Sequence, residues 1–586
     1  MRRVLQYWHT LRHLHPAQVA WRLVRPLRMR IPLPKASRAE WDVTVLHRLR
    51  RFMEEAVQAG LDSDASVLLW LEGNLALAGC RIQTESPERL PWHSRKLSRL
   101  ALFQLHGFRY VRWLAAAGIR GGITADQART LLTAAAQDWI DRNPPLSDPG
   151  WDPYPIAERL FNWILAIAAL EADSEPVRLS AALQALHLSR TLEYDLQGNH
   201  LIREWAALSL ARTALNDPQG AAKALNGLRK AVEQQLLPSG EHHERSWMYH
   251  NQILFDLLAL RAALPEVPSW LDLSVSRMAA ALENALHEDM EIPLFNDAVF
   301  GETPGSRVLL DLAGKSGSDP GNGKTIFCRN ALVPFGTSRI STAAGTLLIK
   351  GGPVGVDHQM GHAHADPGIW ELSRDGLRWV VDAGMHGYGG SALRDACRSA
   401  PAHNTVVINH EEPLEFWGTF RVARRCRFEE GRVLEGRPGE QGVELRYRWF
   451  QGWVHTRVFR IDAEGSVWLE DTVEGTGPLH AASLVHFHPL VKAVAEENGR
   501  VLRLFQNGIA GPALRVESGN GWEPAPGIAP TANTLDADEI PLLSEPGGFY
   551  YCPRFGVALP GSACQVSGSG NGVVRLAIRI LPPSAG

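Results

Sequence analysis

The chain has 586 residues, too many for one ordinary hydrophobic core, so we expect two or more domains. Hydrophobic residues make up 45% and charged residues 21% of it, the profile of a globular protein. The formal net charge of −3 provides no strong positive field, which argues against a nucleic-acid partner. The 6 cysteines form no CxxC pair, which argues against a thiolate zinc site and a disulfide framework.

Residues 1–40 form a basic and aromatic segment that begins MRRVLQYWHTLRHLHP. It lacks the apolar stretch and small-residue cleavage site of a signal peptide, and no apolar run in the chain approaches the length of a membrane span. We therefore expect a cytoplasmic protein without a transmembrane segment, with the periplasm as the alternative. The arginines could lie on a membrane or an acidic partner, but a solvated helix face is the simpler interpretation.

Residues 41–310 have the hydrophobic period of helices. Apolar residues recur at three- and four-residue spacing in the segments 98–118, 157–172, 200–215 and 251–264. Clusters of Pro, Gly and Asp, such as DRNPPLSDPGWDPYP, separate these segments. Many amphipathic helices in series predict helical hairpins that curve into an incomplete α/α toroid.

Residues 314–324, GKSGSDPGNGK, predict a flexible junction, after which the hydrophobic period changes to two. Short β-branched or aromatic segments follow throughout residues 325–586, for example GLRWVVDAG, HNTVVINH and VHTRVFRI. They predict an antiparallel β-sandwich. The predicted fold class is α+β multidomain, and the cleft between its two domains is the natural place for a site.

Two polar clusters precede predicted elements. In GNHLIREWAAL, Asn199 and His200 come directly before a helix, where Asn199 could simply be an N-cap. In ALRDACRSAPAHNTVV, Arg394 and Arg398 lie ahead of a strand. These arginines could bind anionic sugar groups, and the alternative is a structural ion pair.

A third cluster, SGEHHERSWMYHNQ, gathers Glu244, Arg245, Tyr249 and His250 at the start of a helix. One helical turn would join Arg245 to Tyr249. This density of polar side chains next to an otherwise apolar helix exceeds what solubility requires, so we expect these residues to line a binding site.

The stretch GHAHADPGIWEL contains His362, His364 and Asp366 at alternating positions. In a strand all three would share one face; the alternative is a polar loop that leads into a strand. His364 can also be grouped with Asp382 and His403, which come from three successive segments of the β region. Two imidazoles and one carboxylate suit zinc, provided that the segments meet in space.

Taken together, GNHL, ERSxxYH, GHAHAD, VDAG and RSAPAHNTV resemble the heparinase II/III family of polysaccharide lyases, whose superfamily also holds alginate and oligoalginate lyases. The resemblance covers most of the chain, from about residue 151 to residue 475. It implies an α/α toroid followed by an antiparallel β-sandwich, in agreement with the change of period. It also implies an anionic polysaccharide or oligosaccharide as substrate. The arginine-rich opening resembles relatives linked to surface-polysaccharide or exopolysaccharide synthesis, which argues against heparin itself.

The resemblance implies roles for single residues. Asn199 and His200 would meet the carboxylate of a uronic acid, and Tyr249 and His362 would be the catalytic tyrosine and histidine. Tyr388 would contact the substrate. The remaining substrate-binding candidates are Glu244, Arg245, His250, Arg394 and Arg398. The metal ligands would be His364, Asp382 and His403, holding a structural Zn²⁺ near the active site.

A lyase of this kind removes the C5 proton of a uronate and expels the C4 oxygen, which requires stabilisation of the developing enolate charge. If the two groups lie on the same face of the sugar, Tyr249 could take the proton and return it, with Arg245 or histidines lowering its pKa. If they lie on opposite faces, His362 or His200 would be the base and Tyr249 the acid. Two other functions stay open: a non-catalytic glycan-binding or assembly factor, and a hydrolase with two carboxylates such as Glu244 and Asp366.

Overall fold

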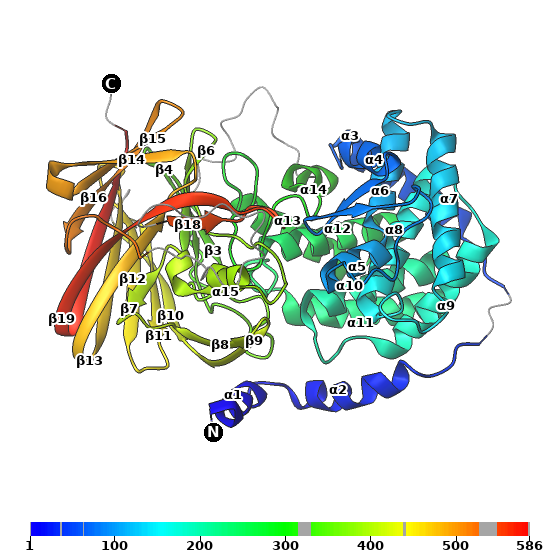
Figure 1. Ribbon diagram of the computed structural model, residues 1–586, viewed down its shortest axis with the longest axis horizontal. Coiled ribbons are helices and arrows are strands. Elements are labelled where there is room, and N and C mark those ends of the chain that lie inside the picture. The colour runs from blue at the N-terminus through cyan, green and yellow to red at the C-terminus, as the bar shows by residue number, and fades with distance from the viewer. Residues whose placement is uncertain are drawn as a thin grey trace.

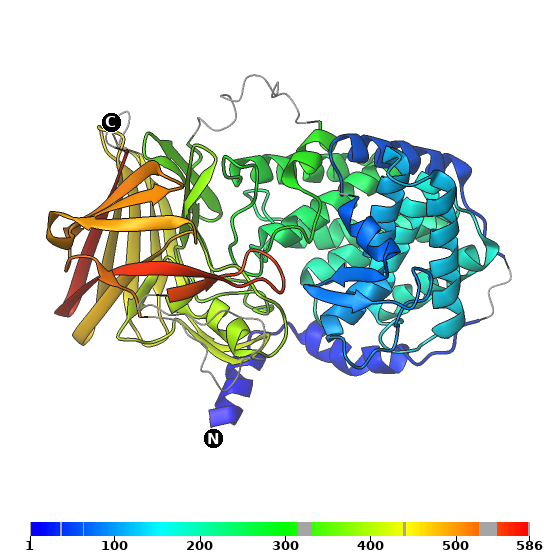
Figure 2. The same ribbon diagram turned by 45° about the horizontal axis from the view of Figure 1, so that its top comes forward.

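The structure is a computed structural model that describes residues 2–34, 38–62, 64–314, 330–436, 441–526 and 548–583. A helical domain and a β domain lie side by side, and the N-terminal helices run along the outside of both (Figures 1 and 2). Residues 315–324 of the predicted junction lie outside the described residues.

The helical domain is built from helices in chain order and one small hairpin. Its helices are α3 (Val43–Gln58), α4 (Ala65–Leu71), α5 (Arg99–Gly107), α6 (Arg109–Arg120), α7 (Ala125–Arg142), α8 (Pro153–Leu170), α9 (Glu175–Thr191), α10 (Gly198–Ala214), α11 (Pro218–Gln235), α12 (Trp247–Ala263), α13 (Ser269–Asn284) and α14 (Ser306–Leu312). The hairpin is β1 (Asn74–Leu77) with β2 (Cys80–Gln83).

Inner and outer helices alternate along the chain, as the toroid prediction requires. The helices α8 and α12 are buried along almost their whole length, and α10 along most of it. The helices between and after them, α9, α11 and α13, bury only one face. Because α10 contacts both α8 and α12, these three form an inner layer that the outer helices cover.

The predicted helix over residues 98–118 is two helices. Phe108 has a left-handed backbone with φ 58°, which ends α5 and starts α6. The break exposes backbone carbonyls, and side chains of α8 satisfy them: Arg159 donates to the His106 carbonyl at 2.7 Å and Asn162 donates to the Gly107 carbonyl at 2.8 Å. Tertiary contacts of this kind are invisible to hydrophobic periodicity.

In the β domain, every pairing between named strands of the described chain is antiparallel, as predicted. A four-stranded sheet contains β3 (Thr337–Thr342), β4 (Gly345–Lys350), β5 (Trp370–Arg374) and β6 (Leu377–Val380). An eleven-stranded sheet has the main order β10 (Arg427–Leu434), β11 (Gly442–Arg448), β12 (Val454–Ile461), β13 (Val467–His486), β19 (Leu559–Leu581), β16 (Ile509–Ser518), β15 (Val501–Gln506) and β14 (Val491–Glu496).

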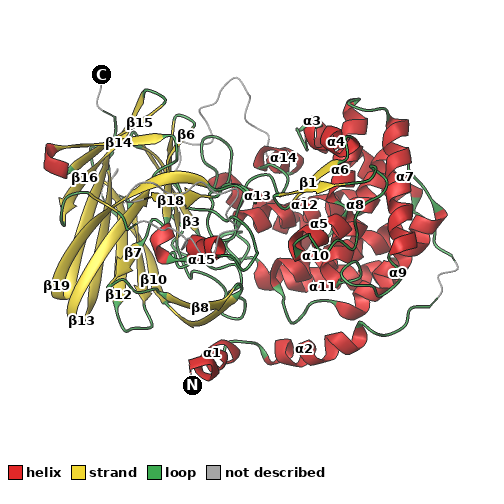
Figure 3. Ribbon diagram, viewed as in Figure 1, coloured by secondary structure: helices red, strands yellow, loops and turns green. Residues whose placement is uncertain are grey.

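Smaller elements complete the β domain (Figure 3). The short strands β7 (Val406–Ile408), β17 (Glu523–Pro524) and β18 (Gly548–Tyr551) pair with β13 or β19 of the large sheet, and β8 (Leu414–Gly418) pairs with β9 (Arg421–Arg425). One helix, α15 (Ala392–Arg398), and the 3-10 turns η1 (Ala400–Ala402) and η2 (Glu497–Gly499) lie in the connections.

The two sheets share one hydrophobic core, which makes the domain a sandwich. Leu347 and Trp370 of the small sheet belong to the same buried cluster as Leu445 and Phe459 of the large one. The rings of Trp370 and Phe459 meet with centroids 6.4 Å apart. Along β12, buried residues alternate with less buried ones from His455 onward, so one side of the strand faces this core.

The basic N-terminal segment forms two helices, α1 (Arg2–Leu11) and α2 (Pro16–Arg28), which we call the strap. Figure 1 shows the strap in dark blue beneath both domains. Among the described residues, no helix is both long enough and apolar enough to cross a bilayer.

Candidate functional site

Three inner helices bring their N-terminal turns together beside the β domain. Tyr154 on α8 stacks on His200 of α10, with ring centroids 4.1 Å apart. Gln252 of α12 donates to the Tyr154 hydroxyl at 2.9 Å. Asn199 of α10 donates from Nδ2 to Glu244, just before α12, at 2.8 Å. The polar clusters that interrupt the helical pattern therefore meet at one place.

Asn199 lies inside the first turn of α10, and the N-cap is Gln197, so the N-cap interpretation of Asn199 is wrong. The residue before it, Gly198, has φ +60°, and a Cβ there would collide with the side chains of Glu244 and Gln359. Glycine is therefore required at this position, because it lets the helix approach the carboxylate closely. Gln359 itself donates to Glu244 at 2.7 Å from the β domain, so this contact joins both domains.

His200 is held by a carboxylate that the sequence did not single out. Its Nδ1 lies 2.6 Å from Glu193 Oε2, and Arg25 of the strap donates to the other oxygen of Glu193 at 2.7 Å. Burial raises the pKa of Glu193, but the hydrogen bond and charge of His200, together with Arg25, outweigh burial and lower it. The Nε2 atom of His200 has no hydrogen-bond partner within the described chain, and the side chain is 27% exposed.

Tyr249 meets the β domain through two aromatic residues. Its hydroxyl is in hydrogen-bond contact with the Tyr388 hydroxyl, and its ring centroid lies 4.6 Å from that of His362. Burial raises the pKa of Tyr249 well above its usual value, and the neighbouring Tyr388 and Asp297 raise it further. The expectation that Arg245 or histidines lower this pKa is therefore wrong, and Tyr249 is a neutral phenol at neutral pH.

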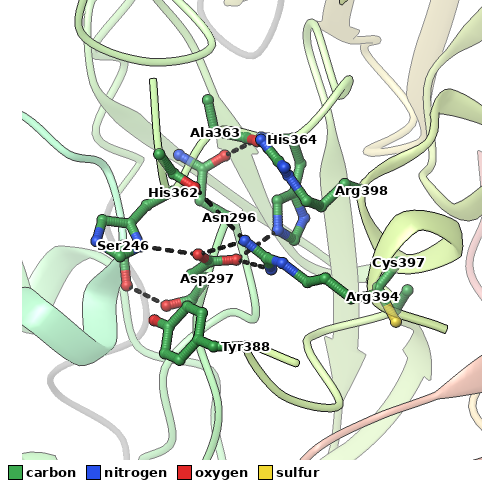
Figure 4. Close-up of polar contacts among 12 residues, drawn as sticks. Ser246, Asn296, Asp297, His362, Ala363, His364, Tyr388, Arg394, Cys397 and Arg398 are labelled. Atoms are coloured by element: carbon green, nitrogen blue, oxygen red, sulfur yellow. Dashed lines mark hydrogen bonds and ion pairs between the residues drawn. The ribbon is translucent and has the colours of Figure 1, made fainter. Parts of the chain in front are cut away.

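Asp297 is the centre of the site, as Figure 4 shows. One of its oxygens lies 2.7 Å from His362 Nδ1, and the other lies 2.8 Å from His364 Nε2. Both oxygens also accept from the guanidinium of Arg394. Burial alone would raise the pKa of Asp297, but Arg394 and the two histidines hold it well below its usual value. Asp297 is thus a buried anion that fixes both rings.

Asp297 was not among the sequence candidates. The signal that could have indicated it is the pair Asn296-Asp297, two polar residues inside the otherwise apolar run IPLFNDAVF. Both prove to be fully buried, and the Asn296 side chain donates to the Val354 carbonyl at 3.2 Å. The hydrogen-bond partner of Asn296 lies more than 50 residues away in sequence, so the local pattern does not identify it.

The predicted metal ligands His364, Asp382 and His403 come together, with one ligand atom of each lying within 4.8 Å of the others. They are fully buried, and each has one polar atom without a hydrogen-bond partner in the described chain: Nδ1 of His364, Oδ2 of Asp382 and Nε2 of His403. The opposite atom of each is bonded, His364 to Asp297 and His403 to Asp382 at 2.6 Å. Ligand atoms of this kind, oriented by bonds on their far side, fit a metal ion.

A second buried group, His242, His243 and Glu244, also has one ligand atom of each residue within 4.8 Å of the others and could bind a metal. Its fit is poorer, because both oxygens of Glu244 already accept hydrogen bonds from Asn199 or Gln359. Burial raises the pKa of Glu244, but the charges of His362 and the two adjacent histidines and the Asn199 backbone lower it to about 2.

Four expected substrate contacts are placed elsewhere. Arg245 precedes α12 with φ 58° and donates to the Gly351 and Phe335 carbonyls, so no helical turn joins it to Tyr249. His250 is 1% exposed, and its Nε2 lies 3.0 Å from the Met278 carbonyl.

Arg394 and Arg398 are 0% and 1% exposed. Arg394 binds Asp297, and Arg398 donates to the backbone carbonyls of Ala363, Gly418 and Thr419. Both arginines hold the loop of His362 and His364. Arg394 does so through the ion pair considered as the alternative, and Arg398 through hydrogen bonds to backbone carbonyls, without an ion pair among the described residues.

The GHAHAD stretch is a loop ahead of β5, so the strand interpretation is wrong and the loop interpretation is correct. Asp366 is fully buried and forms an ion pair with Lys350, while Glu244 is 3% exposed. Neither carboxylate is free in the described structure, which removes the pair considered for a hydrolase.

Two family models match the chain, and both describe one family. Residues 101–306 match the family described as Heparinase II/III N-terminus, and residues 328–542 match Heparinase II/III-like, C-terminal. No curated protein sequence matches the chain.

Solved structures of similar fold share little sequence with the chain. A structure described as heparinase III has a TM-score of 0.66 at 15% identity, over 97% of this chain and 90% of that one. The heparinase III product of BT4657 has a TM-score of 0.59 at 16% identity, over 89% and 84%. The heparan sulfate lyase HepC from Pedobacter heparinus has a TM-score of 0.56 at 14% identity, over 97% and 88%.

Proposed function

The chain belongs to the heparinase II/III-like family, and on that premise we propose that it is a polysaccharide lyase that cleaves a uronic-acid-containing glycan by β-elimination. The observation that supports this most directly is the meeting of Tyr249, Tyr388 and the Asp297-bound His362 next to Asn199 and His200. These groups supply what the reaction needs: a base, an acid and a partner for the carboxylate.

Carboxylate binding is supported by the helix ends. The N-terminal turns of α8, α10 and α12 meet at the site, and each carries a partial positive charge. Asn199 and His200 lie in the first turn of α10, where the Asn199 amide, which gives one N–H to Glu244, has a second N–H for the uronate, and where Nε2 of His200 can also meet it. The same groups would stabilise the enolate charge that develops when the C5 proton leaves.

His362 is the base that the geometry favours. Asp297 is an anion, so His362 donates to it from Nδ1, which leaves Nε2 as the nitrogen that points away from Asp297. The His362 Nε2 atom makes no hydrogen bond inside the described chain, and the side chain is 12% exposed. An imidazole oriented by a carboxylate, with the opposite nitrogen available, is suited to proton abstraction.

Tyr249 then acts as the acid. Because its pKa is raised, the phenol carries a proton that it can donate to the C4 oxygen. The C5 proton passes to His362 Nε2, the C4–O bond breaks, a C4–C5 double bond forms, and the leaving oxygen takes the proton of Tyr249. Of the two mechanisms left open by the sequence, the protonated phenol of Tyr249 and the Asp297-oriented ring of His362 favour a histidine base and a tyrosine acid.

We further propose that His364, Asp382 and His403 hold a metal ion and that this ion is zinc, which two imidazoles and a carboxylate suit. When bound, zinc would cross-link the segments that carry its ligands and thereby fix the loop of His362. His364 would both bind the zinc and help to orient His362, because its other nitrogen is bonded to the same Asp297 that holds His362.

The polymer is proposed from the sequence alone: an anionic surface polysaccharide or exopolysaccharide rather than heparin. Glycan binding or assembly without catalysis is the alternative function. It needs neither the oriented His362 nor the protonated Tyr249, whereas both are present.

The test is ultraviolet absorbance during incubation with a panel of polyuronates, including heparan sulfate, alginate and the producing cell's own surface polysaccharide. A lyase generates an unsaturated uronate that absorbs, and Tyr249→Phe should abolish the rise. The exposed Tyr7 provides a matched control, because Tyr7→Phe should leave the rate unchanged. Binding of a polyuronate without any rise in absorbance would contradict the lyase proposal and support the alternative.

A further inference from the structure

We infer that the strap, α1 and α2, docks the protein on an anionic lipid bilayer through its outward face. The inference concerns a surface outside the candidate active site, and it does not depend on the proposed lyase activity.

The strap contacts the protein through a mostly polar side, to which Tyr7 and Trp21 add ring contacts with Trp417 and Tyr194. On α1, Gln6 is 7% exposed and donates to Glu415 at 3.3 Å, and the Thr10 hydroxyl accepts from Trp417 at 3.1 Å. On α2, Gln18 is 2% exposed and donates to the Asp195 carbonyl at 3.3 Å, and Arg25 binds Glu193. Hydrogen bonds and ion pairs thus fix the orientation of both helices.

The apolar side of the strap consequently faces away from the protein. In α1 the exposed apolar side chains are Val4 (70%), Leu5 (50%), Tyr7 (48%), Trp8 (62%) and Leu11 (50%). In and after α2 they are Val19 (44%), Leu23 (74%), Val24 (39%), Leu27 (67%) and Ile31 (43%).

Spacings of three and four residues place most of these side chains on one stripe of each helix. A surface helix of a globular protein normally turns such a stripe toward the core. Ten of the 24 exposed large hydrophobic side chains in the described chain lie between Val4 and Ile31. An apolar surface this concentrated requires a partner.

The charge of the strap indicates what that partner is. Residues 2–31 contain 7 arginines and no acidic residue, in a chain whose net charge is −3. Arg25 is paired with carboxylates, but Arg3, Arg12, Arg28 and Arg30 are exposed and form no ion pair with a described carboxylate. An amphipathic helix with arginines beside its apolar stripe, and with the exposed Trp8 in the stripe, fits the interface of an anionic bilayer.

A second copy of the chain fits less well. In a two-fold dimer through the strap, each outward face would meet an identical one, and the unpaired arginines of both copies would lie close together. An anionic bilayer has an apolar interior for the hydrophobic stripe and negatively charged headgroups for the arginines, so it matches both features of the strap.

The test is flotation of the full-length protein with phosphatidylcholine vesicles, with and without phosphatidylglycerol. We expect binding that requires phosphatidylglycerol and weakens at high salt. The double variant Leu23→Gln/Leu27→Gln should lower the partition coefficient by about tenfold or more, because both side chains would lie in the apolar layer. Since both are exposed, the variant should fold normally, which circular dichroism checks.

The matched control is Leu273→Gln on α13, because Leu273 is 60% exposed on a helix outside the strap. It should bind vesicles like the wild type. Absence of binding to anionic vesicles, or an equal loss in the control, would overturn the inference. A further contrary result is a dimer in light scattering that Leu23→Gln/Leu27→Gln converts to a monomer. That result would also overturn the inference and would assign the outward face to a second copy of the chain.

Discussion

Asp297 shows how much of the candidate site depends on one residue. It orients His362, binds the far side of the metal-ligand candidate His364, and neutralises the buried Arg394. Lone buried charges are costly, so removal of the anion would affect all three partners together.

Asp297→Asn should therefore lower kcat/KM by roughly 10- to 100-fold, the usual cost of removing a group that orients catalytic or metal-binding side chains. The amide keeps the shape of the side chain, but it cannot accept from both histidines and Arg394 as an anion does. The measurement is the initial rate of unsaturated-product formation. Asp395→Asn, at an exposed position of α15, is the control and should keep wild-type activity. An active Asp297→Asn enzyme would remove Asp297 from the mechanism.

The metal assignment is tested at the same scale. We expect the purified protein to bind one zinc per chain and His403→Ala to lose it, because the variant removes one of three ligands. His242→Ala, in the second metal-capable group, should retain the zinc. Elemental analysis by mass spectrometry measures both. Loss of zinc from His242→Ala together with retention in His403→Ala would reverse the assignment.

At the scale of elements, α12 links the two halves of the site. Ser246 caps this helix, and its hydroxyl donates to the Asp297 backbone carbonyl at 2.7 Å. Tyr249 lies one turn later. The start of α12 therefore sets the distance between the tyrosine of the helical domain and the aspartate that holds His362.

Ser246→Ala should lower the free energy of unfolding by about 1 kcal/mol, the usual cost of an N-cap, and should also lower kcat. Ser98 caps α5 in the same way and lies outside the site, so Ser98→Ala should have a similar cost in stability with unchanged kcat. Chemical denaturation and steady-state kinetics measure the two quantities. If both variants lowered kcat equally, the loss of kcat would result from lower overall stability and not from the position of α12.

At the scale of the whole molecule, the helical domain buries histidines that must stay neutral. Burial lowers the pKa of His106 to about 3 and the pKa of His187 and His250 to about 4. In the unfolded chain these groups titrate near their ordinary pKa of 6.5. Between these limits the unfolded state binds protons that the folded state does not, so stability falls as the pH falls below 6.5.

Three such histidines give a slope of at most roughly 4 kcal/mol per pH unit in the free energy of unfolding. Urea denaturation followed by circular dichroism at several pH values between neutral and mildly acidic measures it. His106 accepts from Trp139 and donates toward the Trp92 carbonyl, and glutamine can do both. His106→Gln should therefore reduce the slope by roughly 1.4 kcal/mol per pH unit. An unchanged slope would show that His106 is protonated in the folded protein.

The sequence by itself determined what depends on local pattern. The change of hydrophobic period predicted a helical domain followed by an antiparallel β domain, and the structure confirms it. The residue types of His364, Asp382 and His403 predicted a set that does assemble, because metal chemistry restricts ligands to few side chains. Tyr249, Tyr388 and His362 were singled out through the resemblance to the family, and they meet.

Only the tertiary structure decided which polar residues face the site and in what charge state. Arg245, Arg394 and Arg398 looked like sugar-binding cations, but distant backbone carbonyls and Asp297 bind them. The pKa of Tyr249 is raised by burial, which no local pattern encodes. Asp297 and Glu193 gain their roles from partners far away in sequence, and the strap turns its apolar side outward because its polar side finds partners on both domains. Hydrogen bonding and desolvation depend on neighbours in space, and folding alone brings those neighbours together.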